Sequence, residues 1–181
     1  MPKYVVGNIM DALGCVPTIC ITTNGFVKKD GSNVMGAGLA KKMSEMFPWL
    51  PKAVGDHIKA NGHNVGVVGL GPTVLVSFPT KPASDLVNLD KSNVVPWARD
   101  KLDAGNYAPG FYCESDLRII KSSCIELMQL LETGEIKQPV LMPIAGCGAG
   151  CLKFAQVKPI LDEYLSDEVL VMSYKESDFE L

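Results

Sequence analysis

Two glycine-rich segments each follow a short apolar run, an arrangement in which a loop can bind an anion. The first begins at Thr23-Asn24-Gly25 and continues through residues 31–38 (GSNVMGAG), and the second covers residues 143–151 (PIAGCGAGC). Glycines at such junctions let the backbone approach a ligand closely and present N–H groups to it. The two segments together predict a phosphate or pyrophosphate site, with ordinary tight turns as the alternative.

A lysine follows a third apolar run. Lys81 lies in residues 77–82 (SFPTKP), at the end of the run VLVSF. Open α/β sheets bind ligands beyond the carboxyl ends of their strands, so a lysine here is placed for catalysis or anion binding. A lysine partly withdrawn from water can lose its proton and act as a nucleophile or a base. The alternative is a solvated lysine at the end of a strand.

The elements that position these residues alternate between short apolar runs and longer amphipathic segments. This alternation predicts one α/β domain over residues 1–181, a three-layer α/β/α fold with a mixed central sheet. Continuous apolar runs suit strands that are covered on both faces. We expect strands at Lys3–Val6, Thr18–Thr23, Val65–Val68, Val74–Phe78, Pro139–Pro143 and Glu168–Ser173. We expect helices at Gly36–Met46, Pro51–Ala60, Asp116–Leu131 and Ala155–Leu165, the third with Ser115 as its N-cap.

Residues 82–114 do not follow this pattern. They contain three prolines, two glycines and the aromatic residues Trp97, Tyr107, Phe111 and Tyr112, without a sustained period. An irregular segment of this length is either a lid over a substrate or a surface insertion packed by its own aromatic side chains. The sequence leaves both readings open.

The composition excludes several classes of protein. Seventeen basic and twenty acidic residues give a net charge of -3, so a strongly basic surface for non-specific nucleic-acid binding is not expected. No apolar run approaches the roughly 18 residues that span a bilayer, and the first residues lack the layout of a signal peptide. We therefore expect a soluble, cytoplasmic and monomeric protein that does not bind membranes.

The six cysteines and two histidines do not predict a metal centre. The cysteines are Cys15, Cys20, Cys113, Cys124, Cys147 and Cys151, and the histidines are His57 and His63. None shows the paired spacing of a zinc site, and without a secretory segment reduced thiols are expected. A cysteine nucleophile with a histidine base is a minor alternative. Neither a full dinucleotide fingerprint nor a GxxxxGK[ST] loop is present, so no cofactor is expected and NAD is a poor candidate ligand.

Several ordered motifs make the sequence resemble the macrodomains, a family that binds ADP-ribose. The motifs are residues 5–9 (VVGNI), 23–25 (TNG), 33–40 (NVMGAGLA), 47–48 (FP), 78–81 (FPTK) and 143–150 (PIAGCGAG). The resemblance covers most of the chain apart from residues 82–114. It is strongest to the branch that holds terminal ADP-ribose glycohydrolases, DNA ADP-ribosyl glycohydrolase antitoxins, ADP-ribose 1''-phosphate phosphatases and phage relatives. A phage-encoded member would act in the host cytoplasm.

The resemblance implies a set of ligand-binding residues. Asn8 stands where family members use an Asp to hold the adenine amino group, and the backbone of Ile9 would complete that contact. Tyr174 stands where the family often has an aromatic residue near adenine, with edge packing as the alternative role. The distal-ribose loop would comprise Asn24, Asn33, Met35, Gly36, Ala37 and Gly38. The pyrophosphate loop would comprise Gly146, Cys147, Gly148, Ala149, Gly150, Cys151 and Leu152.

The resemblance also implies an activity. Lys81 matches the lysine on which removal of ADP-ribose depends in this branch, whereas Gly150 stands where some members carry an assisting Asp. The implied function is a hydrolase that removes ADP-ribose from a nucleobase or an acidic side chain by cleavage at the distal ribose C1''. The alternatives are an ADP-ribose 1''-phosphate phosphatase and a non-catalytic ADP-ribose-binding module. Asp30 and Asp85 lie in neighbouring loops, but the sequence assigns neither a catalytic role.

Overall fold

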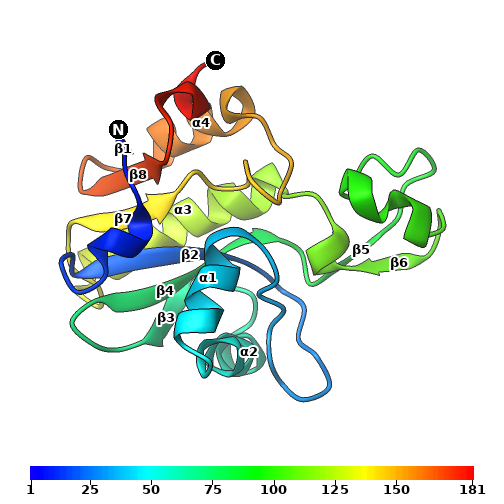
Figure 1. Cartoon of the computed structure of the whole chain (residues 1–181), viewed down its shortest axis with the longest axis horizontal. Coiled ribbons are helices and arrows are strands. Elements are labelled where there is room, and N and C mark those ends of the chain that lie inside the picture. Colours follow the sequence, from blue (N-terminus) through cyan, green and yellow to red (C-terminus); the bar gives the residue numbers. More distant parts are fainter.

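A six-stranded mixed sheet with helices on both faces forms the centre of the computed structural model, which describes all 181 residues (Figure 1). The strands lie in the order β1-β8-β7-β2-β4-β3, all parallel except the antiparallel edge strand β3. Their bounds are β1 Lys3–Val6, β2 Thr18–Asn24, β3 Gly66–Gly69, β4 Val74–Lys81, β7 Val140–Pro143 and β8 Val169–Ser173. The predicted fold class is confirmed.

The central strands are apolar on both faces, as their continuous apolar runs predicted. In β2, Ile19 and Ile21 pack in one cluster with α1 and α2, whereas Cys20 packs in the other cluster with α3 and α4. This is the two-residue alternation of a strand covered on both sides. The helices are α1 Gly38–Met46, α2 Leu50–Asn61, α3 Leu117–Glu132 and α4 Phe154–Tyr164.

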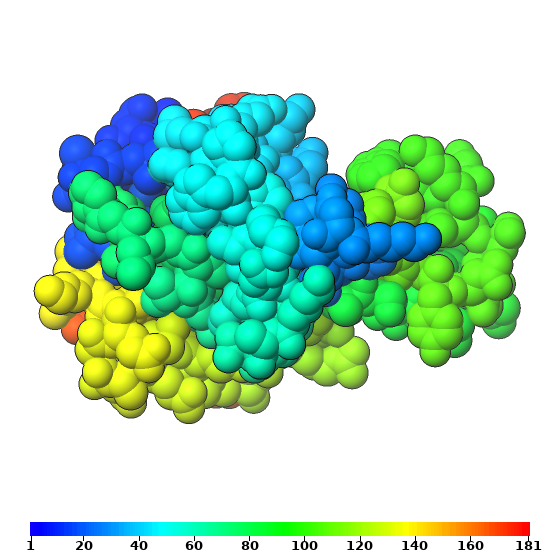
Figure 2. Space-filling view, turned by 90° about the horizontal axis from the view of Figure 1, so that it is seen from below, coloured from blue at the N-terminus to red at the C-terminus, as the bar shows by residue number.

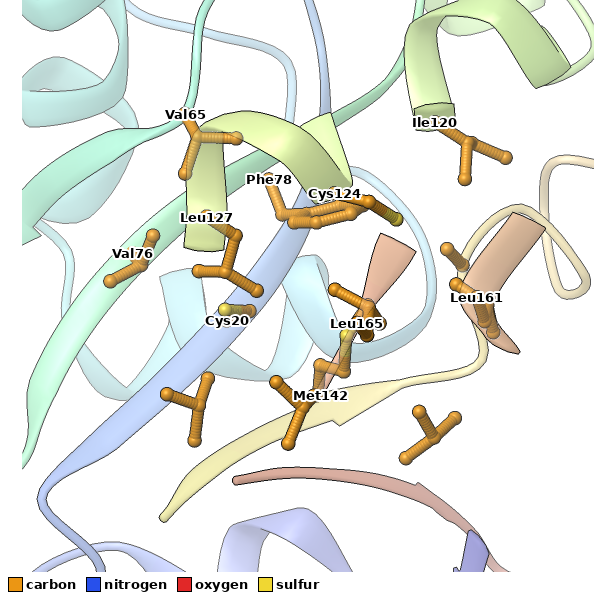
Figure 3. Close-up of a cluster of buried hydrophobic side chains, with 14 of the residues drawn as sticks. Cys20, Val65, Val76, Phe78, Ile120, Cys124, Leu127, Met142, Leu161 and Leu165 are labelled. Carbon is orange, nitrogen blue, oxygen red and sulfur yellow. The ribbon is translucent and has the colours of Figure 1, made fainter. Parts of the chain in front are cut away.

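The larger cluster fills the space between the sheet and the pair α3 and α4. Figure 3 shows Cys20 of β2, Phe78 of β4 and Met142 of β7 facing Cys124 and Leu127 of α3. Phe78 is the largest of the fully buried side chains. Because Phe78 lies three residues before Lys81, the packing of this cluster also fixes the end of β4 where the lysine stands.

Strand β4 extends further than the sequence predicted. We expected it to end at Phe78, but it continues through Pro79 and Thr80 to Lys81. Pro79 lacks a backbone donor, and it lies where the pairing with β2 becomes irregular: Thr23 lies opposite Pro79 and Asn24 opposite Lys81, which leaves Thr80 as an extra residue on β4. Lys81 is therefore the last residue of a strand rather than part of a loop.

Residues 82–114 form a small structured lobe, so the prediction of an irregular segment was wrong in part. The lobe holds strands β5 Ser84–Leu86 and β6 Tyr107–Pro109 and the short helices η2 Pro96–Lys101 and η3 Gly110–Tyr112. It projects beside the main sheet (Figures 1 and 2). Its own buried residues are Val87, Val94, Val95, Ala98, Ala108 and Cys113. These elements are three to six residues long, too short to produce a recognisable period in the sequence.

A close backbone contact joins the lobe to the sheet. The Gly110 N–H donates to Ala83 O at 2.8 Å, and a Cβ at position 110 would lie 1.7 Å from Pro82 O. Only glycine therefore fits at position 110, where the returning chain crosses the outgoing one.

No helix of the chain is long and apolar enough to cross a membrane, and all six cysteines are free thiols.

Replacing Phe78 tests the link between core packing and the sheet. We expect Phe78→Ala to lower the free energy of unfolding by about 3–5 kcal/mol, because a fully buried ring leaves a cavity. Leu89→Ala is the control, because Leu89 is 94% exposed in the lobe, and surface truncations change stability by about 0.5 kcal/mol or less. Urea denaturation measures both, and equal losses would contradict the packing described above.

Candidate functional site

Two adjoining cavities form one cleft at the carboxyl ends of the parallel strands. We call the cavity of about 440 Å³ that contains Ile9 and Tyr174 the tyrosine end. We call the cavity of about 370 Å³ that contains Lys81 the lysine end. Gly38, Leu39, Pro143, Ile144 and Gly148 line both ends. The cleft lies beyond the ends of the neighbouring strands β2 and β7. The strand that follows β7 in the chain, β8, lies on one side of this pair, and the strands that follow β2, β3 and β4, lie on the other side. Such a point is the usual ligand position in open α/β sheets.

The second glycine-rich segment forms one wall, with its amides unpaired. The N–H groups of Cys147, Gly148, Ala149 and Gly150 donate to no protein group. The loop is closed instead by Leu152, whose N–H donates to Gly146 O at 3.0 Å. Free N–H groups of successive residues in a glycine-rich loop attract anions. All seven predicted residues of this loop except Cys151, which is exposed, line one or both ends of the cleft.

The first glycine-rich segment forms the opposite wall. Gly36, Ala37 and Gly38 line the lysine end at the start of α1, and their N–H groups also lack protein partners. Met35 lies instead in the core beneath α1. The helix dipole adds a partial positive charge at this position. The structure therefore presents two rows of unpaired amides across the cleft.

Two buried asparagines hold the first loop in shape. The Asn24 side chain donates to Val34 O at 2.8 Å and accepts from the Phe26 N–H at 2.9 Å. The Asn33 side chain donates to Asn24 O and to Phe26 O, both at 2.8 Å. Asn24 lines the lysine end, whereas Asn33 lies behind it, with its Oδ1 buried and unpaired.

Gly150 has no room for a side chain. A Cβ at this position would lie 2.1 Å from Ser115 Oγ and 2.4 Å from Gly146 O. The Ser115 N–H also donates to Gly150 O at 2.9 Å. An Asp at position 150 is therefore incompatible with this loop geometry. The close packing of the loop against Ser115 explains why the chain has glycine rather than that acid at this position.

Ser115 was assigned the wrong role from the sequence. Asp116 is the N-cap of α3, because its side chain accepts from the Arg118 N–H at 2.8 Å. Ser115 instead lies between the lobe and the second glycine loop, 7% exposed, and its Oγ has no hydrogen-bond partner. A serine directly before an aspartate gives two possible caps, and the sequence does not decide between them.

Lys81 is buried at the lysine end, with 8% of its surface exposed. Its Nζ lies 3.5 Å from Phe111 O in the lobe. Burial lowers the pKa of Lys81, against an opposing effect from the neighbouring Cys151, Cys113 and Glu114. No carboxylate forms an ion pair with Lys81. A larger fraction of this amine is therefore neutral than in a solvated lysine.

The backbone around Lys81 is held from three sides. Thr80 O accepts from the Asp116 N–H at 2.9 Å, and Pro82 O accepts from the Gly25 N–H at 3.1 Å. Lys81 O accepts from His63 Nε2 at 2.7 Å. Since a carbonyl accepts only from a protonated nitrogen, His63 in its neutral form carries its proton on Nε2. His63 Nδ1 is buried without a partner, and burial lowers the pKa of the ring.

The lobe supplies an aromatic wall to the lysine end. Trp97 and Phe111 line it, and Phe111 contacts Phe26 of the first glycine segment with ring centroids 5.2 Å apart. Trp97 packs edge-on against Tyr112 at 5.3 Å yet is 59% exposed. Figure 2 shows the segment of Phe26 lying against the lobe. Asp30 and Asp85 line neither end of the cleft.

Asn8 does not line the tyrosine end, although Ile9 and Tyr174 do. Its side-chain oxygen accepts from the Met10 N–H at 3.1 Å and from the Tyr174 hydroxyl at 3.2 Å. Its Nδ2 donates to Asp11. Asn8 thus caps the short helix η1 Ile9–Ala12 and orients Tyr174.

Comparison with known proteins identifies the fold. No family model and no curated protein sequence matches the chain. Among solved structures, the macrodomain of Mycobacterium tuberculosis DarG is 19% identical with a TM-score of 0.63, covering 95% of this chain and 97% of its own. The macrodomain of Thermus aquaticus DarG is 21% identical with a TM-score of 0.64, covering 97% and 98%.

A third solved structure includes a ligand. Thermosipho africanus DarTG in complex with ADP-ribose is 19% identical with a TM-score of 0.65, covering 94% of this chain and 41% of that one. At these identities the similarity concerns the fold. The chain has the macrodomain fold, as the sequence motifs implied.

Two glycines of the second loop provide a matched pair of variants. We expect Gly150→Ala to lower the free energy of unfolding by about 2 kcal/mol or more, because its Cβ meets Ser115 and a backbone oxygen. Gly148→Ala should change it by about 0.5 kcal/mol or less, because nothing lies within 4 Å of the added Cβ. Chemical denaturation measures both, and an equally stable Gly150→Ala protein would contradict the close packing against Ser115.

The two histidines allow a test of the contact to Lys81. Burial lowers the pKa of His63 below its ordinary 6.5. As the pH falls, the His63 ring therefore takes up a proton at a higher pH in the unfolded chain than in the folded protein. Stability should therefore fall as the pH drops below about 6.5 toward the folded-state pKa. His63→Gln should remove this part of the pH dependence, whereas His57→Gln, at a half-buried histidine bonded to Asn64 O, should retain it. Unfolding free energies at pH 7 and pH 5 measure the effect, and equal slopes in both variants would refute it.

Proposed function

We propose that the protein binds ADP-ribose in the cleft and removes it from a macromolecule by hydrolysis at the distal ribose C1''. The observation that carries this proposal is a buried lysine of lowered pKa beside two rows of unpaired backbone amides. The macrodomain fold and the ADP-ribose named in the complex of a structural neighbour support the choice of ligand.

The shape of the cleft supports one orientation of the ligand. The pyrophosphate would lie between residues 147–150 and the start of α1, where the free amides converge. The adenosine half would then occupy the tyrosine end, where Ile9, Phe154 and Tyr174 offer apolar and aromatic surface. The distal ribose would reach the lysine end, with its C1'' near Lys81 and its conjugate toward Trp97 and Phe111.

Hydrolysis breaks the bond between C1'' and the conjugate. The oxygen of water forms the new bond to C1'', and the proton from water ends on the leaving group. The neutral form of Lys81 can accept a proton from that water or attack C1'' itself. Contacts to the pyrophosphate and adenine, remote from the reacting bond, would orient C1'' against this amine.

A non-catalytic ADP-ribose-binding module is the second candidate function. It is favoured by the packing at Gly150, which leaves no space for an assisting acid beside the glycine loop. Such a module would use the same cleft and the same unpaired amides. The two candidates differ only in whether the conjugate is released.

The test combines binding and turnover. We expect release of ADP-ribose from ADP-ribosylated thymidine DNA or from ADP-ribosyl-glutamate peptides, with a loss of about 10²-fold or more in Lys81→Ala. ADP-ribose binding by calorimetry should change little in this variant, because the amides that would hold the pyrophosphate remain. Lys41→Ala, at an exposed lysine of α1 paired with Glu45, is the control and should retain full activity.

Each other outcome selects a different conclusion. Release undiminished in Lys81→Ala would refute the role of the lysine. Tight ADP-ribose binding without turnover of any conjugate would establish the binding module instead. Phosphate release from ADP-ribose 1''-phosphate, with no release from the macromolecular conjugates, would identify a phosphatase.

A further inference from the structure

The tyrosine end of the cleft contains a single carboxylate. Among its lining residues, Ile9, Phe154 and Met172 are apolar, and the charged ones are Lys42 and Asp178. Asp178 lies in the short C-terminal helix η4 Glu176–Phe179. Neither the sequence motifs nor the family resemblance gave this residue a role.

Asp178 is held in place by its neighbours. The adjacent Phe179 packs against Tyr4 and Phe154, with ring centroids 5.5 Å away in each case. The Ser173 hydroxyl donates to Asp178 Oδ2, which leaves Oδ1 without a protein donor. A carboxylate fixed on one oxygen and open on the other is prepared to accept a hydrogen bond from a ligand.

The charge of Asp178 remains unneutralised. Lys42, the cation of this cavity, donates to the Tyr174 hydroxyl at 2.8 Å and lies over the Tyr174 ring at 4.9 Å. No ion pair links it to Asp178. Burial raises the pKa of Cys147 to about 11, and the charge of Asp178 adds to this effect. The carboxylate therefore lies close to a thiol that lines the same cavity.

Asn8, the residue that the motif pattern assigned to adenine, is already saturated. A side-chain carbonyl oxygen has two lone pairs, and those of Asn8 are occupied by the Met10 N–H and the Tyr174 hydroxyl. Accepting a ligand amino group would break one of these bonds. Asn8 is also absent from the lining of the cavity, whereas Asp178 forms part of it.

We propose that Asp178, rather than Asn8, accepts the exocyclic amino group of the adenine and thereby selects the base. The apolar and aromatic side chains would pack on the faces of the purine. The carboxylate oxygen that has no protein donor would accept a hydrogen bond from the purine amino group. This inference rests on the proposed function, because it places the adenosine half of ADP-ribose in the tyrosine end. It changes the source of base specificity from the N-terminal motif to the C-terminal helix.

The experiment compares ADP-ribose with its analogue that lacks the purine 6-amino group. A hydrogen bond to a charged acceptor contributes enough for the wild-type protein to prefer ADP-ribose by about tenfold or more. Asp178→Ala should lose this preference by weakening ADP-ribose binding and leaving analogue binding unchanged. Asp178→Asn, which keeps a neutral acceptor, should retain an intermediate preference. Calorimetry measures the affinity of each protein, including the control variant below, for both ligands.

Asp11→Asn is the matched control, because Asp11 lies at the same end of the molecule, bonds Asn8 and does not line the cavity. It should keep the wild-type preference, and thermal denaturation should show that all three variants are folded. If the wild-type protein does not bind ADP-ribose, the proposed function fails. If it binds ADP-ribose but either lacks the preference or keeps it in Asp178→Ala, the assignment of Asp178 is overturned.

Discussion

The fixed position of the end of β4 is the constraint on which the lysine end depends. Four consecutive carbonyl groups, from Pro79 to Pro82, accept hydrogen bonds from Ser123, Asp116, His63 and Gly25. These donors come from α3, from its N-cap, from the segment after α2 and from the first glycine loop. A buried amine at this position loses hydration, and the lowered pKa of Lys81 follows from that loss. The same bonds that stabilise the fold therefore set the chemistry of the lysine.

Under the proposed function, backbone groups rather than charged side chains would hold the pyrophosphate in this cleft. The chain has a net charge of -3, and the two loops facing each other across the cleft contribute unpaired N–H groups. The second loop presents its amides to the cleft because its backbone packs closely against neighbouring segments, with no side chain between them. Gly150 against Ser115 is the clearest example, since a single Cβ there would displace the loop. The lack of an assisting acid is thus a consequence of how this loop packs.

Two segments outside the main six-stranded sheet complete the two ends of the cleft. The lobe of residues 82–114 adds Trp97 and Phe111 at the lysine end, and the C-terminal helix η4 adds Asp178 at the tyrosine end. The lobe packs through its own small core, whereas η4 packs on the main core through Phe179. The exposed side chains that they add to the cleft, Trp97 and Asp178, are therefore separate from the buried packing that stabilises the fold.

The sequence by itself determined the fold class, the approximate bounds of most elements and the two glycine loops, because apolar periodicity and glycine spacing are local properties. It also identified Lys81, which follows its strand directly. Only the tertiary structure decided that β4 reaches Lys81, that residues 82–114 are ordered, that Asp116 rather than Ser115 caps α3, and that Asn8 is saturated. Ser115 and Asp178 line the cleft, and His63 bonds the Lys81 carbonyl, through contacts between residues distant in the chain. Such contacts leave no periodic signal in the sequence, because they depend on how separate elements pack together.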